Sequence, residues 1–457
     1  MENEVDNNEN EFRDSISTIS KTTGKREWIY PKKPSGKFHN YRSIVAVILL
    51  LILFGLPLIK VNGQPLVLFN FIDRIFIFFG LSFGPYDFHI VVLVMIATIV
   101  FVVLFTAVYG RIFCGWACPQ TIFMEMVFRK IEYWIDGDSK QQRELAAAPL
   151  SGKKLLKRTT KFFIFLGISY IISHTFMAYL IGIDKVMSVV SSPPSENWTG
   201  FVALNVFTGL FFFVFWWFRE QACVIVCPYG RLQGVLLDQN SLVVAYDFIR
   251  GEPRGKINRN EIRTNGDCID CKLCVDVCPT GIDIRNGIQL ECVNCTACMD
   301  ACDYVMNKIK KPEGLIRIDS LNGVREGKKF KFSLRLGLYS VFLTLLIIIT
   351  SILIISRKDV EVNILRTPGM LYQDQPENKI SNLYNFHLIN KTFESIPVDF
   401  KIKNIDGEIK ILGGDSKVDA QQVYEGKFML VFNKDQLKTL NTKIDIAVLV
   451  NGKEIET

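Results

Sequence analysis

The twelve cysteines of this 457-residue chain fall into four short clusters, and their spacing limits the possible folds more than any other feature. Two clusters repeat the pattern C-x2-C-x2-C-x3-C. The first runs from Cys268 to Cys278 and precedes Pro279, and the second, after a gap of thirteen residues, runs from Cys292 to Cys302. A doubled run of this kind is the ligand pattern of bacterial ferredoxins that carry two [4Fe-4S] clusters.

The ferredoxin pattern also predicts which cysteines share a cluster, because the fourth cysteine of each run ligates the cluster of the other run. One predicted ligand set is Cys268, Cys271, Cys274 and Cys302, and the other is Cys278, Cys292, Cys295 and Cys298. Structural zinc sites also use CxxC pairs. They rarely repeat this four-cysteine run twice, so the iron-sulfur interpretation is favoured. Asp303 replaces the proline expected after the second run, which removes no ligand.

The hydropathy of the chain predicts a membrane protein. Apolar residues make up 49% of the sequence, and 35 residues are Phe. Five apolar stretches approach the length of about 20 residues needed to cross a bilayer: 43–59, 89–109, 162–183, 201–218 and 336–355. A sixth stretch, 66–83, is rich in Phe but interrupted by Asn70, Asp73 and Arg74. We interpret it as an interfacial or re-entrant segment.

The net charge of +7 is unevenly distributed. Lys and Arg gather before the first, third and fifth apolar stretches, within 21–42, 153–161 and 325–335. By the positive-inside rule, these flanks, the N-terminus and the ferredoxin region are cytoplasmic and the C-terminal region is extracytoplasmic. Basic runs that adjoin membrane spans disfavour nucleic-acid binding. Residues 1–24 are polar and lack an apolar core, which predicts a disordered tail and no signal peptide.

The other four cysteines form two CxxxCP motifs, Cys114 to Pro119 and Cys223 to Pro228. Each motif follows the second span of a two-span hairpin, so the membrane part is an internal duplication that brings both motifs to the cytoplasmic face. Residues four apart share a helix face, which predicts that each pair presents two sulfurs together. The prolines should end one helix and open the next, over 119–133 and 228–238.

The chemistry of Cys114, Cys118, Cys223 and Cys227 is left open by the residues alone. Thiolates select soft ions such as copper(I), paired thiols can cycle with a disulfide, and buried cysteines can also be inert. Two identically spaced pairs favour functional sulfur. Arg231, beside the second pair, could help to keep thiols ionised.

Five further polar residues lie near the spans. His89 and His174 could ligate a haem or an exported metal, although hydrogen bonding to a neighbouring helix is the more frequent role of a polar residue in a span. Arg111 and Arg219, with Glu220, are interpreted as anchors at the membrane interface. This leaves the cysteines as the main candidates for chemistry.

Residues 359–457 alternate apolar and polar positions with the period of a β-strand. Turn signals separate the alternating segments, which predicts an immunoglobulin-like sandwich that serves as a docking module, with His387 as a strand residue. The predicted fold is therefore a multidomain membrane protein with a duplicated five-span helical domain, a ferredoxin insert and an all-β tail. The expected boundaries are a tail at 1–42, the duplicated domain at 43–239, the ferredoxin domain at 240–335, the fifth helix at 336–356 and the sandwich at 357–457.

These motifs resemble the CcoG family, also called FixG or RdxA, which are accessory proteins for the assembly of the cbb3-type cytochrome c oxidase. The two CxxxCP motifs, the ferredoxin insert between the fourth and fifth spans, and the sandwich tail carry the resemblance, which extends from about Glu27 to the C-terminus. It implies a cupric reductase of the bacterial cytoplasmic membrane that supplies copper(I), with oxidase subunits and copper chaperones as partners. The CxxxCP cysteines would then bind copper or relay electrons to it.

Two other functions are compatible with the sequence. One is a quinol-oxidising membrane ferredoxin subunit of a periplasmic reductase pathway, which the sandwich tail disfavours. The other is a non-catalytic assembly scaffold. The sequence contains no Gly-rich dinucleotide fingerprint, phosphate loop or flavin motif. The electron donor is therefore another protein, a membrane quinol or a site that the sequence does not show.

Overall fold

The computed structural model describes residues 18–19, 24–61, 63–72, 74–256, 265–327, 334–369, 372–412, 417–437, 442–450 and 452–456. The chain divides into two compact units, which are described separately. The first unit comprises Met1–Ile59 and Met95–Ile347, and the second comprises Lys60–Val94 and Ile348–Thr457. The predicted tail at 1–24 and the lysines at 328–331 lie largely outside the described residues.

Within the described part of the chain, five helical segments are long and apolar enough to cross a membrane, which confirms the five predicted spans. They are Lys37–Leu58, Pro85–Tyr109, Gly152–Ile181, Trp198–Phe218 and Leu336–Ile355. The first span begins at Lys37, earlier than its apolar run suggests. The corresponding helices are α2 (Lys37–Gly55), α3 (Phe88–Tyr109), α8 (Gly152–Ile181), α10 (Trp198–Phe213) and α16 (Leu334–Ile355).

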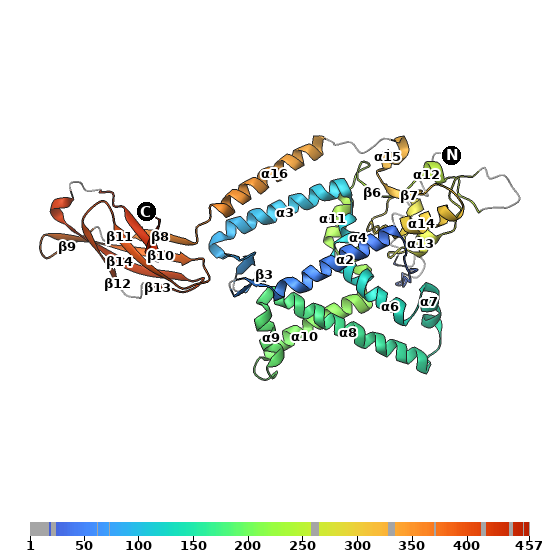
Figure 1. Cartoon of the computed structure of the whole chain (residues 1–457), viewed down its shortest axis with the longest axis horizontal. Helices are drawn as coiled ribbons and strands as arrows, with labels where there is room; N and C mark the ends of the chain where they lie inside the picture. The colour runs from blue at the N-terminus through green and yellow to red at the C-terminus, as the bar shows by residue number, and fades with distance from the viewer. Residues whose placement is uncertain are drawn as a thin grey trace. The chain divides into compact units, whose positions relative to one another are not determined.

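Helices α8 and α10 pack side by side in the first unit, and a short helix α9 (Ile183–Ser191) joins them (Figure 1). Aromatic side chains fill the space between the two halves of the duplication. Phe128 stacks on Phe215 at 4.5 Å between ring centroids and meets Phe165 edge-on at 4.7 Å. All three rings are buried, so the two repeats share one apolar core.

Each CxxxCP motif lies in a run of short helical pieces. The first run is α4 (Ile112–Trp116), α5 (Pro119–Ile122), the π-helix η3 (Phe123–Phe128), α6 (Arg129–Ile135) and α7 (Ser139–Ala147). The second is the π-helices η4 (Val214–Phe218) and η5 (Ala222–Val226), followed by α11 (Pro228–Leu236).

The prolines act as predicted, since Pro119 and Pro228 each open a helix. The residues before them, Cys118 and Cys227, have extended backbones with ψ of 125° and 109°, as the ring of a following proline requires. The expectation that both cysteines of a pair share one helical face is therefore wrong. The first cysteine of each pair lies within a helical turn, and the second caps the next helix.

The ferredoxin region belongs to the first unit. A two-stranded antiparallel sheet pairs β6 (Val243–Tyr246) with β7 (Ile316–Asp319), so the two ends of the region meet. The helices are α12 (Phe248–Gly251), α13 (Leu273–Asp276), α14 (Ala297–Lys308) and α15 (Leu321–Glu326). Met299, Met306 and Ile316 are buried among them.

In the second unit, the stretch 66–83 contains a three-stranded antiparallel sheet, which was not predicted from the sequence. Its location at the membrane interface stays a prediction. Its strands are β3 (Val67–Asn70), β4 (Ile75–Phe78) and β5 (Leu81–Phe83), in spatial order β3-β4-β5. Phe69 and Phe78 meet edge-on at 5.3 Å across the first pair of strands. The Phe residues thus form cross-strand contacts. A short hairpin precedes the sheet, with strands β1 (Lys60–Val61) and β2 (Gln64–Pro65).

The C-terminal part is the predicted immunoglobulin-like sandwich. One sheet has the order β12-β14-β10-β8, with β9 paired to β10, and the other has the order β13-β11-β15-β16. Buried Leu388, Phe428 and Leu430 form the centre of the core between the sheets. His387 is a strand residue, as predicted, and lies opposite Glu425. The strands are β8 (Val360–Arg366), β9 (Gln373–Gln375), β10 (Lys379–Asn390), β11 (Ile396–Ile402), β12 (Gly407–Leu412), β13 (Lys417–Val418), β14 (Val423–Asn433), β15 (Ile446–Val450) and β16 (Lys453–Glu456).

A buried carboxylate connects three segments of the second unit. Asp87 accepts contacts from Arg357 Nε at 3.0 Å and from Lys391 Nζ at 2.7 Å, and its side chain is 2% exposed. The residues come from the start of the second span, the end of the fifth span and the loop after β10. This carboxylate therefore joins the small sheet to the sandwich.

Replacing Asp87 by Asn should destabilise the second unit by about 3–5 kcal/mol, because removal of one partner leaves a buried cation uncompensated. Protease resistance of the full chain in increasing urea measures this. Asp374→Asn is the control, since Asp374 pairs with Lys434 on the surface and such pairs contribute about 0–1 kcal/mol. Equal losses for the two variants would contradict the assignment.

Candidate redox site

Two cavities in the ferredoxin region are lined by the cysteines of the doubled run. Cys268, Cys271, Cys274 and Cys302 line one, together with apolar residues such as Leu315 and Ile316. Cys278, Cys292, Cys295 and Cys298 line the other, together with Val244 and Ile282, and Cys274 borders it as well. The structure therefore brings together the two sets that the sequence grouped. Four sulfurs around an apolar space fit a [4Fe-4S] cluster.

The backbone repeats one unusual turn in both runs. Asp270 and Lys272 flank the second cysteine of the first run with φ of 51° and 55°. Asn294 and Thr296 occupy the equivalent positions of the second run with φ of 53° and 65°. Residues other than Gly rarely adopt such angles and do so at a cost. Their repetition shows that the chain wraps around both cavities in the same way.

The first CxxxCP motif packs directly on the second ferredoxin run. Cys114 is buried in one apolar cluster with Cys295 and partly buried Cys298. Gly115 makes this approach possible, because a Cβ atom there would lie 2.5 Å from Val293 O and 2.9 Å from Cys295 Cα. A redox group held by the CxxxCP motif would thus be the immediate neighbour of a group held in the second cavity.

The four CxxxCP thiols converge. Burial raises the pKa of Cys223 to about 12, and the nearby thiols of Cys118, Cys114 and Cys227 contribute to the shift. Burial also raises the pKa of Cys114 to about 11, against the opposing charge of Arg111. The duplication therefore brings both pairs to one place, as predicted. A metal ion bound there would have to displace protons.

Sequence reasoning missed the polar residues that surround these thiols. Cys114 donates to Gln233 Oε1 at 2.9 Å, and the fully buried Gln233 donates in turn to Thr106 at 3.2 Å. These groups fix the orientation of the Cys114 thiol. The position of Gln233 offered a weak signal of this contact, because Gln233 lies on the helix that begins at Pro228, directly after the second cysteine pair.

Three residues that were interpreted as interfacial anchors have other positions. Arg111 is 3% exposed, donates to Leu290 O and faces the Cys114 thiol. Arg219 and Glu220 are also buried, in ion pairs. Arg231 is exposed, so Arg111 is the cation beside these thiols. The spacing of three residues between Arg111 and Cys114 could have indicated this contact, because residues three apart are neighbours on a helix.

The two candidate histidines belong to different units. His89 is exposed at the start of α3. His174 Nδ1 lies 2.8 Å from Tyr170 O of its own helix, and the two rings contact each other in a tilted arrangement, with centroids 3.8 Å apart. Within the described ranges, no three His, Cys, Asp or Glu side chains are grouped so as to hold a single metal ion.

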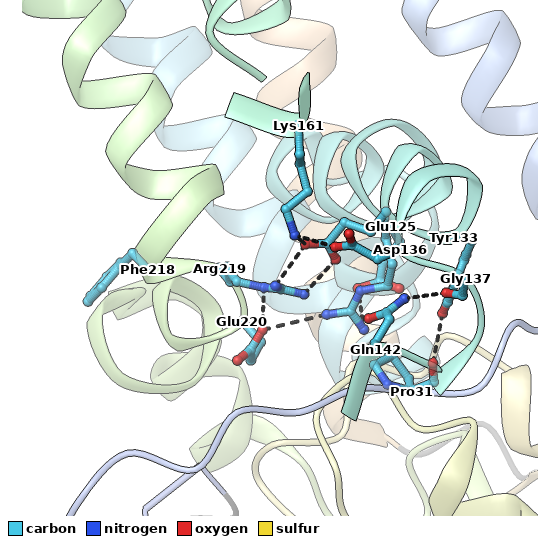
Figure 2. A network of polar contacts seen from close by, with 12 residues as sticks. Pro31, Glu125, Tyr133, Asp136, Gly137, Gln142, Lys161, Phe218, Arg219 and Glu220 are labelled. Atoms are coloured by element: carbon cyan, nitrogen blue, oxygen red, sulfur yellow. Dashed lines mark hydrogen bonds and ion pairs between the residues drawn. The ribbon is translucent and has the colours of Figure 1, made fainter. Parts of the chain in front are cut away.

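A buried network of ion pairs joins the two halves of the duplication (Figure 2). Glu132 of α6 forms a bidentate pair with Arg219, at 3.0 Å and 2.9 Å, and also contacts Lys161 of α8 at 3.2 Å. Glu220 contacts Arg129 at 3.5 Å. The network consists of four cations and four carboxylates: Arg26, Arg129, Lys161 and Arg219, with Glu125, Glu132, Asp136 and Glu220.

This balance explains how so many charges are tolerated inside the protein, since buried charges persist only when they are paired. Burial opposes the ionisation of Glu132, but the charges of Arg219, Lys161 and Arg129 outweigh it and lower its pKa. Arg219 lies four residues before Cys223, and α6 follows the first CxxxCP motif. The network therefore sets the position of one motif relative to the other.

Gly115→Ala should separate the first CxxxCP motif from the ferredoxin run, because the new methyl group would overlap the backbone of Val293. Overpacking of this kind costs about 1–3 kcal/mol. Thermal unfolding of the full chain in detergent, followed by the visible absorption of the iron-sulfur clusters, measures the loss. Gly209→Ala in α10 is the matched control, as its Cβ would meet nothing within 4 Å. Equal stability of the two variants would refute the contact.

Glu132→Gln should destabilise the first unit by about 3–5 kcal/mol, since Arg219 and Lys161 would lose a buried partner. The effect should also depend on pH. Because the pKa of Glu132 is lowered in the folded protein, its contribution is present above the unfolded pKa of about 4.3 and is lost as the pH falls through the folded value.

Denaturant unfolding of the full chain at neutral and acidic pH measures the effect of Glu132→Gln. The exposed Glu144 provides the control Glu144→Gln. The stability difference between the two variants should shrink at acidic pH. A difference that stays constant with pH, or that is absent at neutral pH, would contradict the role given to Glu132.

Three family models match parts of this chain. Residues 218–321 match a family described as a 4Fe-4S dicluster domain, and residues 91–139 match a 4Fe-4S binding domain. Residues 350–457 match the Ig-like fold at the C-terminal of FixG. A crystal structure of a FixG-related protein from Vibrio parahaemolyticus covers 22% of this chain at 18% identity, with a TM-score of 0.17.

Three curated proteins are similar over much of the chain. Protein RdxB of Cereibacter sphaeroides is 33% identical over 387 residues, which are 81% of each protein. Protein RdxA of the same organism is 32% identical over 385 residues, which are 80% of each. The nitrogen fixation protein FixG of Rhizobium meliloti is 33% identical over 309 residues, which are 65% of this chain and 58% of FixG.

The spans, the cysteine-lined cavities and the matched domains define a multi-pass membrane iron-sulfur redox protein. Its chemistry is electron transfer by [4Fe-4S] clusters. The length and level of the similarity to RdxB and RdxA show that the chain belongs to the FixG/RdxA family.

Proposed function

We propose that this protein is a cupric reductase that converts copper(II) to copper(I) for the assembly of a cbb3-type cytochrome c oxidase. The observation that carries the proposal is the contact between the first CxxxCP motif and the second ferredoxin run, in which Cys114 packs against Cys295 and Cys298. A thiol-rich site beside a one-electron cofactor is suited to a metal ion that changes its charge by one unit.

The ligand sets follow the two cavities. Cys268, Cys271, Cys274 and Cys302 would hold one cluster, and Cys278, Cys292, Cys295 and Cys298 the other. Bound there, the clusters would supply single electrons. The chain's own residues exclude water from the cavities with apolar side chains such as Ile284 and Met306.

The four CxxxCP cysteines are the proposed copper site or the relay to it. Each copper(II) ion takes up one electron and becomes copper(I), an ion that thiolates retain strongly. Burial keeps the thiols of Cys114 and Cys223 protonated before the metal arrives, so binding would release protons. Arg111 would favour the ionised form of Cys114, and Gln233 would orient its sulfur.

The basic flanks of the spans support the bacterial cytoplasmic membrane as the location, with the ferredoxin region in the cytoplasm and the sandwich outside. Oxidase subunits and copper chaperones are the proposed partners, and the sandwich is the proposed docking module. In this arrangement, the reduced ion would be formed on the side of the membrane where the clusters are protected from oxidation.

The function is tested anaerobically on the purified full chain. The protein is reduced with dithionite, freed of excess reductant and mixed with copper(II), and the EPR signals of reduced clusters and of copper(II) are followed together. We expect both signals to disappear in equal amounts, one copper ion for each electron. Persistence of both signals would rule out the cupric reductase and direct attention to quinol or protein redox partners.

The CxxxCP cysteines are tested by the double replacement of Cys114 and Cys118 by Ser. This variant should lose copper reduction while its cluster spectrum remains, because neither residue lines a ferredoxin cavity. A His89→Gln, His174→Gln double variant is the control and should reduce copper normally. Loss of the clusters in the cysteine variant would show that the motifs serve structure. Loss of activity in the histidine variant would show that copper reduction depends on His89 or His174.

A further inference from the structure

A cavity of about 460 Å³ in the first unit lies where the first membrane span begins. The redox chemistry described above does not use it. Four of the residues around it can carry positive charge: Lys33, His39, Arg42 and Lys130. Its other lining residues are Pro34, Glu125, Met126, Tyr133 and Trp134. The cavity therefore combines basic groups with an apolar and aromatic wall.

Among the basic residues of this cavity, Arg42 is buried, whereas Lys33 and Lys130 are exposed. No ion pair joins Lys33, Arg42 or Lys130 to a carboxylate among the described residues. Glu125, the acidic lining residue, is paired with Arg129 at 3.3 Å, inside the balanced network. Burial and the charges of Arg42 and Lys33 lower the pKa of Lys130, as expected where cations crowd together without a counter-ion.

Arg42 provides a second observation that favours an anionic ligand. The residue is 4% exposed, and its Nε donates to Gly115 O at 2.7 Å. Its Nη2 atom is buried and has no hydrogen-bond partner. An unpaired guanidinium nitrogen inside a protein is costly. Arg42 is one of the residues that line the cavity.

The nearby carboxylates are already engaged. Asp300 of α14 accepts the backbone N–H groups of Phe38 and His39 at 3.1 Å and 2.8 Å and so caps α2. Asp138 accepts the backbone N–H of Lys33 at 2.9 Å. These two carboxylates therefore satisfy backbone groups, and neither of them forms an ion pair with Lys33, Arg42 or Lys130 among the described residues.

We propose that this cavity binds a phosphate group, with Arg42, Lys33 and Lys130 as its donors. Arginine and lysine together are suited to phosphate oxygens, the first through a planar fork and the second as a point charge. The phosphate belongs either to a phospholipid headgroup or to a soluble phosphate. Basic pockets between helices at the start of a span are typical lipid-headgroup sites, and Met126 and the exposed Trp134 provide apolar surface for the glycerol and the first acyl carbons.

The site would lie beside the redox centre. Arg42 donates to the carbonyl of Gly115, the residue whose missing side chain lets the CxxxCP motif contact Cys295. A bound anion would neutralise the charge of Arg42, whose hydrogen-bond partner Gly115 contacts the second ferredoxin run. Its presence does not depend on copper being the substrate.

The test measures binding to the full chain in an uncharged detergent by isothermal titration calorimetry. The probes are dihexanoyl phosphatidylglycerol below its micellar concentration, inorganic phosphate and uncharged dihexanoyl glycerol. The variant is Lys33→Gln with Lys130→Gln, and the matched control is Lys140→Gln with Lys153→Gln, which removes two exposed charges elsewhere. We expect the first pair to weaken binding by about tenfold or more, because charge-assisted hydrogen bonds are lost, and the control to bind as the unmodified protein does.

Each outcome decides the proposal. Binding of phosphatidylglycerol alone supports a lipid headgroup, and binding of both phosphate probes supports a soluble phosphate. The proposal is overturned if neither phosphate probe binds, if dihexanoyl glycerol binds as tightly as phosphatidylglycerol, or if the Lys33 and Lys130 variant binds as the control does. It is also overturned if a short-chain quinol binds where the phosphate probes do not. The cluster absorption of each variant verifies that it is folded.

Discussion

The bidentate pair between Glu132 and Arg219 is the interaction on which the first unit depends. The two residues come from different halves of the duplication, and each half carries one CxxxCP motif. Apolar packing of Phe128 on Phe215 brings the halves together but has little directional preference. Ion pairs with defined geometry do have a directional preference, and they fix the orientation of the two motifs relative to each other.

The same constraint explains the irregular helices around the site. The π-helix η5 lies within the second CxxxCP motif, and η3 and η4 lie close to the motifs in sequence. Arg219 has φ of 54°, which is costly for a residue with a side chain. A π-turn rotates the following residues about the helix axis. In a regular helix, Arg219 and Glu220 would point in other directions. The strain at this point is offset by the buried ion pairs that it makes possible.

Much of this arrangement could be predicted from the sequence, because it depends on the spacing of residues that are close together in the chain. The cysteine runs, the apolar stretches, the prolines after the CxxxCP motifs and the alternation in the sandwich each express a short-range rule. Even the grouping of Cys302 with the first run follows from a known pattern. The strands at 66–83 were not predicted, since a Phe-rich stretch that is interrupted by Asn70, Asp73 and Arg74 fits an interfacial or re-entrant segment as well as a small sheet.

The long-range polar contacts were not predictable for a different reason. Arg111, Arg219 and Glu220 stand at the ends of spans, where charged residues are usually interfacial anchors. Their burial depends on partners about 90 residues away or more, such as Glu132 for Arg219 and Leu290 for Arg111. No periodicity connects such positions. A sequence can show that a charge is present, but the partner that neutralises it is visible only once the chain is folded.

Two adjacent basic residues of helix α6, Arg129 and Lys130, have different surroundings in the folded chain. Arg129 points into the balanced network, where its neighbours Glu125 and Glu220 supply opposite charge. Lys130, the next residue, lines the basic cavity, where the neighbouring groups Arg42 and Lys33 repel it. Both are ordinary basic residues in the sequence. The fold gives Arg129 two carboxylate partners and places Lys130 at the cavity, which is why we assign stability to the network and propose binding for the cavity.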